Sequence, residues 1–156
     1  MKNLILIAAL FLFVGCSNDD DKASEDITIT AVGQGSLSSS TIEKANMVIT
    51  NKITWEALIA KMNEYNKNTT EIFLKETDID FSKFNVIAVF YKQQSNMSTS
   101  IDVTKATIRS GKIIIRVENL KVGFTNDVSQ PFHIVKIPKS SKNIVFEKIK
   151  NPLLPE

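Results

Sequence analysis

The pattern of apolar and polar residues changes its period along the chain and so predicts different elements in turn. Residues 27–32 alternate apolar side chains with threonine, which is typical of a half-buried strand, and the polar stretch 33–36 is predicted to be a loop that ends it. A second short strand is predicted at 47–49. From Thr54 to Tyr65 apolar residues recur every three or four positions, which predicts one helix with Thr54 as its N-cap.

The middle of the chain predicts a buried core. Trp55 falls on the apolar stripe of the helix, so we assign it to the core and not to a ligand-stacking surface. Residues 85–91 are a continuous apolar run, which indicates a central strand buried on both faces. Asp78 and Asp80 have no further donor nearby, and Asp80 is predicted to cap a tight turn instead of forming an acid pair.

The second half of the chain reads as strands. A hairpin is predicted from residues 101–104 and 113–118, with Gly111 in its turn at positive φ. Two further strands are predicted at 132–137 and 143–147. The expected fold class is therefore α+β: a mainly antiparallel sheet of about six or seven strands with one packed helix.

Composition limits the chemistry of this domain, which we assign to residues 27–150. Of 156 residues, 43% are hydrophobic and 23% are charged, as expected for one folded domain. One cysteine and one histidine are too few for a zinc site or a disulfide framework, and no cofactor is predicted. Residues 105–150 carry 10 basic and 3 acidic side chains. The basic residues are interleaved with apolar residues in a strand-like pattern, which favours solvent-exposed strand faces over a surface that binds nucleic acid.

The first 15 residues have the layout of a secretory signal. Its apolar run, residues 4–14, is shorter than the roughly 20 residues that a membrane-spanning helix needs. The sequence 13–16 resembles the bacterial lipobox, which implies that the signal is removed and that Cys16 is lipidated. Residues 16–26 follow as an acidic tether, with five acidic side chains between 17 and 26.

An acidic run behind a lipidated cysteine resembles the export signal of surface lipoproteins in the Bacteroidota. The expected location is the outer membrane, with a lipid anchor and display at the cell surface. A periplasm-facing orientation stays open.

Four segments resemble the PrcB-type protease-complex subunits, a family of bacterial secreted and lipoprotein domains whose namesake stabilises a serine protease at the cell surface. They are residues 54–58, residues 79–90, the hairpin up to Val117, and residues 130–138 followed by Val145 and Phe146. The resemblance covers most of residues 46–147. It implies a binding module, an accessory subunit that binds and stabilises or restrains a surface or periplasmic protease.

The candidate partner-binding residues come from the polar loops at 93–100 and 123–129 and from the segment that matches the family best. Family members have a glycine-rich turn where this chain has residues 96–101, so a partner contact made by that turn would be altered or lost here. The candidates are Ser95, Asn96, Met97, Ser98, Thr99, Phe124 and Gln130.

Catalysis is not expected. His133 is the only histidine and is predicted to be an outward polar position of a strand, and the chain has no Gly-x-Ser-x-Gly motif. Two other functions stay open. A solute- or glycan-binding lipoprotein would need exposed aromatic residues around a groove, for which Tyr65, Tyr91 and Phe124 are the candidates. A structural envelope-assembly lipoprotein would add an exposed strand edge, free of Pro and Lys, to another sheet.

Overall fold

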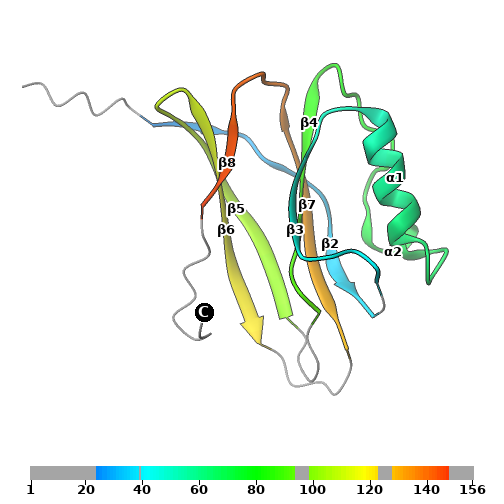
Figure 1. Cartoon of the computed structure of the whole chain (residues 1–156). Helices are drawn as coiled ribbons and strands as arrows, with labels where there is room; N and C mark the ends of the chain where they lie inside the picture. The colour runs from blue at the N-terminus through cyan, green and yellow to red at the C-terminus, as the bar shows by residue number, and fades with distance from the viewer. Residues whose placement is uncertain (1–23, 39, 94–98, 123–127, 148–156) are drawn as a thin grey trace, which may run out of the picture.

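Two four-stranded sheets lie face to face, and two helices cover the outer face of one of them (Figure 1). The computed structural model describes residues 24–38, 40–93, 99–122 and 128–147, with the backbone alone for Thr99 and residues 119–122. The elements are β1 (Glu25–Ile27), β2 (Thr30–Leu37), β3 (Ala45–Ile49), α1 (Lys52–Met62), α2 (Thr69–Phe73), β4 (Phe84–Phe90), β5 (Thr99–Arg109), β6 (Lys112–Val122), β7 (Gln130–Pro138) and β8 (Ile144–Phe146).

The strand order confirms the α+β class with mainly antiparallel pairing and corrects the number of sheets. The open sheet has the order β1-β5-β6-β8, and the helix-covered sheet has the order β2-β7-β4-β3. Every pairing is antiparallel except β6 with β8, which is parallel. The chain crosses between the sheets after β1, after β4, after β6 and after β7. Consecutive strands are therefore divided between two sheets and do not form the single sheet that was predicted.

Two hydrophobic cores fill the spaces between the layers, one between the two sheets and one between the helix-covered sheet and the helices. Strand β4 separates them: Val86, Ala88 and Phe90 pack toward the helices, while Ile87 and Val89 pack toward the open sheet. All five of these side chains are at most 1% exposed. The prediction of a central strand buried on both faces is confirmed, and the three layers follow from it.

Helix α1 begins three residues earlier than the sequence predicts. Its N-cap is Asn51 and not Thr54, because Asn51 Oδ1 accepts a hydrogen bond from the Thr54 backbone N–H at 2.9 Å. The core assignment of Trp55 is confirmed: it is 1% exposed, and its Nε1 donates to the carbonyl oxygen of Thr77 at 2.7 Å. The helix ends at Met62, and Tyr65, beyond it, is 61% exposed.

The predicted polar loop at 33–36 is wrong, because β2 continues through these residues to Leu37. Both glycines are needed where α2 packs on the strand. A Cβ atom on Gly33 would overlap the Leu74 side chain and lie 2.7 Å from the carbonyl oxygen of Phe73, and one on Gly35 would overlap the Phe73 ring. The glycines therefore permit close approach of α2 and do not form a turn.

Two predicted turns are confirmed. The β5–β6 hairpin closes through Ser110 and Gly111, whose φ values of 50° and 75° fit a two-residue turn that follows the twist of the strands. Before β4, the carboxylate of Asp80 accepts hydrogen bonds from the Ser82 hydroxyl at 2.5 Å and the Ser82 backbone N–H at 3.0 Å. These bonds, with Lys83 at 3.1 Å, lower the pKa of Asp80 from 3.8 to about 2.

Candidate functional site

Three connections of the sandwich meet at one end, which we call the loop end: the β2–β3, β4–β5 and β6–β7 connections. Their described residues lie close together, since Phe90 pairs with Phe132 and the backbone of Thr99 pairs with that of Val122. Gln93 Nε2 also donates to the carbonyl oxygen of Ser40 at 2.8 Å, which joins the first two connections. Figure 1 shows this end at the bottom of the molecule.

The N-terminal strand enters at the opposite end, which we call the hairpin end because it carries the Ser110–Gly111 turn. Glu25 pairs with Ile108, two residues before that turn. Strand β5 has 11 residues and runs from one end to the other, so the two ends lie roughly 33 Å apart at the usual rise per residue. Chain that precedes β1 therefore joins the domain at the end away from the three connections.

Gln130 lies at the loop end, but its side chain is not accessible to a partner. It is 1% exposed, and its Nε2 donates to the carbonyl oxygens of Ile42 at 2.6 Å and Tyr91 at 2.9 Å. These bonds hold the β2–β3 connection against the end of β4. The predicted partner contact through this side chain is wrong, because a buried amide that satisfies two carbonyl groups is a structural element of the loop end.

Tyr91 and Lys44 form a second fixed contact at this end. The Tyr91 backbone N–H donates to the carbonyl oxygen of Pro131 at 2.9 Å, and its side chain is 8% exposed. The Lys44 ammonium group lies 5.3 Å from the centre of the Tyr91 ring, within the range of a cation–π contact. The described part of the loop end is thus built from packed and hydrogen-bonded residues that hold the connections in place.

The remaining predicted site residues fall mostly outside the described residues. This holds for Ser95, Asn96, Met97, Ser98 and Phe124, and also for Cys16. The exception is Thr99, which begins β5 by its backbone and so lies in a strand and not in the predicted loop. Next to these segments, Val128 is an apolar side chain that is 47% exposed at the loop end.

His133 is buried between the two sheets, which corrects its predicted outward position. It is 8% exposed, and its Nδ1 accepts a hydrogen bond from the Val103 backbone N–H at 2.9 Å. The histidine on β7 therefore joins the helix-covered sheet to β5 of the open sheet. Burial lowers the pKa of His133 below its ordinary value of 6.5, opposed by the charge of Asp102 and assisted by that of Lys75.

Asp102 and Gln34 complete this polar contact between the sheets. The nearer Asp102 oxygen lies 3.9 Å from His133 Nδ1 and accepts a hydrogen bond from Gln34 Nε2, which also donates to the carbonyl oxygen of Ile101 at 3.3 Å. The sequence prediction missed Gln34 because its two flanking glycines resemble a turn. The apolar residue Leu37, which is buried at the end of β2, could have indicated that the strand continues past the two glycines.

The described residues offer no metal centre and no membrane span. None of their His, Cys, Asp and Glu side chains gather in groups of three or more that would hold a metal ion. In the same part of the chain, no helix is long and apolar enough to cross a membrane.

No family model, curated protein or solved structure matches the chain. The resemblance to the PrcB-type subunits stays a prediction that rests on the residues quoted for it.

Proposed function

We propose that this chain is a non-catalytic binding module of the bacterial envelope, anchored to the outer membrane through a lipidated Cys16. Its loop end binds a protease as an accessory subunit and stabilises or restrains it. The observation that carries the proposal is the placement of the two ends. A lipid-anchored chain that enters at Glu25 leaves the connections at the far end directed away from the membrane. In β-sandwich domains such end loops are a common recognition surface.

The arrangement around His133 favours binding over catalysis. A general base needs a free nitrogen lone pair near the group that it deprotonates. Nδ1 of His133 already accepts the Val103 N–H, and the other nitrogen, Nε2, therefore carries the hydrogen of the neutral ring. Asp102, the nearest carboxylate to this nitrogen, is itself engaged by Gln34. These groups serve the contact between the sheets.

The placement of the aromatic residues favours a protein partner over a glycan. Glycan binding by stacking needs aromatic faces that are open to solvent. Trp55 is 1% exposed and Tyr91 is 8% exposed, so both lie in the cores. Tyr65 is 61% exposed, but it follows α1 on the helix-covered side.

The proposal is tested by recovering the tagged full chain from gently solubilised membranes and identifying its partners by mass spectrometry. Residues 94–98 are replaced by glycine and serine in one variant, which keeps Gln93 and its bond to Ser40. The matched control changes two exposed residues at the hairpin end, Arg109→Ser and Lys112→Ser. We expect a protease in stoichiometric amount with the wild type and the control, and its loss with the loop variant. A wild-type sample without a protease would contradict the proposal.

A further inference from the structure

The two sheets have four edge strands, and three of them are protected against pairing with another chain. Strands β1 and β8 have only three residues each. Strand β2 is bulged between Ala31 and Gly33, and the segment after α2 already pairs with it through a Gly33–Leu74 bridge and a hydrogen bond from the Lys75 N–H to the Val32 carbonyl oxygen at 2.8 Å. Short length, bulges and covering segments are the usual means of blocking an edge.

Strand β3 has none of these protections. Its five residues pair with β4 in a continuous register from Ala45 to Ile49, without a bulge. It contains no proline and no charged residue. Within the described ranges β4 is its only strand partner, so the opposite side of β3 offers unpaired backbone N–H and C=O groups. Asn46 and Val48 are exposed on this strand, Val48 by 36%.

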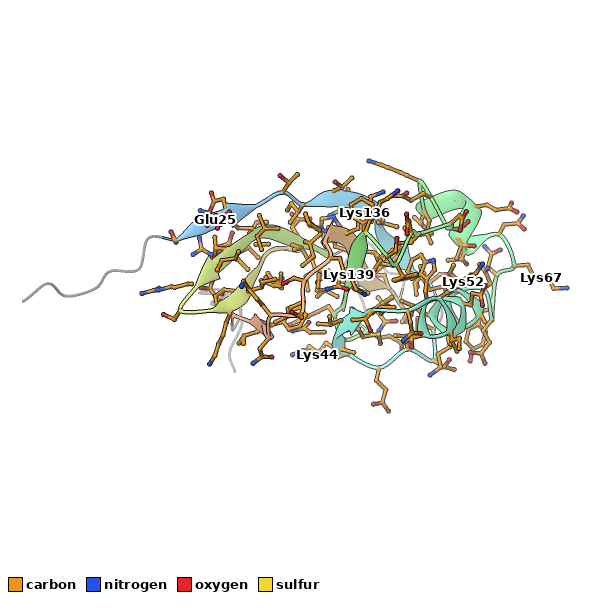
Figure 2. The ribbon with its side chains drawn as sticks, turned by 90° about the horizontal axis from the view of Figure 1, so that it is seen from above. Glu25, Lys44, Lys52, Lys67, Lys136 and Lys139 are labelled. Carbon is orange, nitrogen blue, oxygen red and sulfur yellow. The ribbon has the colours of Figure 1, made fainter. Side chains whose placement is uncertain are left out.

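Lysine side chains lie at both ends of β3. Lys44 directly precedes the strand, and Lys139 Nζ donates to the carbonyl oxygen of Thr50, just after it, at 3.0 Å. Lys52 follows but is paired with Glu56 at 3.8 Å, and Glu43 is the exposed carboxylate beside Lys44. Figure 2 shows Lys44 on the side of the molecule opposite Glu25, the start of β1.

These charges disfavour a second copy as the occupant of the edge. Antiparallel pairing of β3 with β3 of another copy would bring Lys44 of one chain toward Thr50 and Lys139 of the other, which places like charges at both ends of the new ladder. A strand with acidic residues at its ends meets the same lysines with opposite charge. Flanking lysines thus act against self-association and leave the edge open to an acidic partner.

We propose that the β3 edge binds an extended segment of another polypeptide, which adds to the helix-covered sheet as a fifth strand. This segment has apolar side chains and threonine at alternate positions and an acidic residue at each end. Backbone hydrogen bonds supply most of the affinity, and the side chain next to Val48 contributes to specificity. The edge adjoins the loop end at Lys44, but the proposal requires neither the lipid anchor nor a protease.

The test uses the full chain and a fluorescent peptide of sequence Glu-Val-Thr-Val-Thr-Val-Glu, with a second peptide that has lysine at both ends. Fluorescence anisotropy measures Kd, and hydrogen exchange locates the bound peptide. We expect the acidic peptide to bind more tightly, with slower exchange at residues 45–49. Val48→Glu removes an apolar cross-strand contact and adds a charge of the same sign as the peptide ends, so it is expected to weaken binding about fivefold. Val145→Glu, at a similarly exposed valine of β8, is expected to leave Kd unchanged.

Several outcomes would overturn the proposal. They are the absence of saturable binding, tighter binding of the lysine-ended peptide, and slower exchange at residues 144–146 instead of 45–49. A dimer in sedimentation, with exchange at residues 45–49 that slows as the concentration of the protein rises in the absence of peptide, would assign the edge to a second copy. The exchange measurement uses the wild type, so the proposal stays testable if Val48→Glu does not fold. Because no protease is present, a negative result leaves the proposed function of the loop end unaffected.

Discussion

A small number of polar side chains hold together parts of the molecule that are distant in sequence. His133 accepts the Val103 N–H across the two sheets, and Gln130 donates to two carbonyl groups at the loop end. A buried polar group of this kind adds modestly when it is paired but costs about 1–3 kcal/mol when its partner is left unsatisfied. Single substitutions at these positions therefore test the fold directly.

His133 predicts a pH dependence of stability. Burial lowers its pKa in the folded state below the ordinary value of 6.5, so the unfolded chain takes up the proton more readily. The contribution of His133 to the free energy of unfolding is therefore fully present above about pH 6.5. It decreases as the pH falls toward the pKa of His133 in the folded state. Asp102 opposes this shift and Lys75 adds to it.

Urea unfolding of the wild type and His133→Asn at about pH 7.5 and about pH 5 measures this effect. Asparagine has an oxygen near the position of Nδ1 that accepts the Val103 N–H without titrating. The variant is expected to lose less stability than the wild type between the two pH values. Equal losses would show that His133 does not titrate differently in the folded state.

Gly33 predicts a steric effect under α2. Gly33→Ala is expected to lower the free energy of unfolding by about 1–3 kcal/mol, because the added methyl group meets Leu74 and the carbonyl oxygen of Phe73. Gly111→Asn is the control, since that position has open space and asparagine tolerates positive φ. Urea unfolding compares the two. A Gly33 variant as stable as the control would contradict the packing of α2 on β2.

Among the helices and strands, the sequence predicted the features that follow from the local spacing of apolar residues. It missed the features that depend on contacts with distant parts of the chain. The strand at 85–91 and the core position of Trp55 follow from the apolar pattern alone. The continuation of β2 past Gly33 depends on α2, which packs on it from 40 residues later in the chain. The burial of His133 depends on β5 of the other sheet, and no local pattern encodes that contact.

The N-terminus of α1 gives a prediction at this scale. Asn51→Ala removes the acceptor of the Thr54 N–H and is expected to cost about 1 kcal/mol, whereas Asn51→Ser retains a cap and costs less. Thr54→Ala, at the cap that the sequence predicted, removes only an exposed side-chain bond to Asn51 Oδ1 at 3.1 Å. Thermal unfolding ranks the three variants. A larger loss for Thr54→Ala would contradict Asn51 as the cap.

In the molecule as a whole, the proposed function depends on which end carries the proposed lipid anchor. The partner-binding loop residues and the lipidation of Cys16 are predicted from the sequence alone. The separation between the loop end and the start of β1 comes from the strand pairing. The orientation of the loop end relative to the N-terminal end therefore cannot be predicted from the sequence. This orientation follows from the register in which β1 pairs with β5.

The anchor predicts a change of location. Cys16→Ser is expected to move the protein from the detergent-soluble membrane fraction to the aqueous fraction, because several acyl chains give stable tethering that a protein without them lacks. Immunoblotting of the separated fractions measures this. Equal membrane retention of both forms would contradict lipid anchoring through Cys16.

Site-specific photo-crosslinking in living cells tests directly whether a protease binds at the loop end. A photoreactive amino acid replaces Val128, which is 47% exposed at the loop end, and in a second strain it replaces the exposed Lys112 at the hairpin end. We expect a crosslink to a protease from position 128 and none from position 112. A protease captured from position 112 alone, or from neither position, would contradict a partner at the loop end.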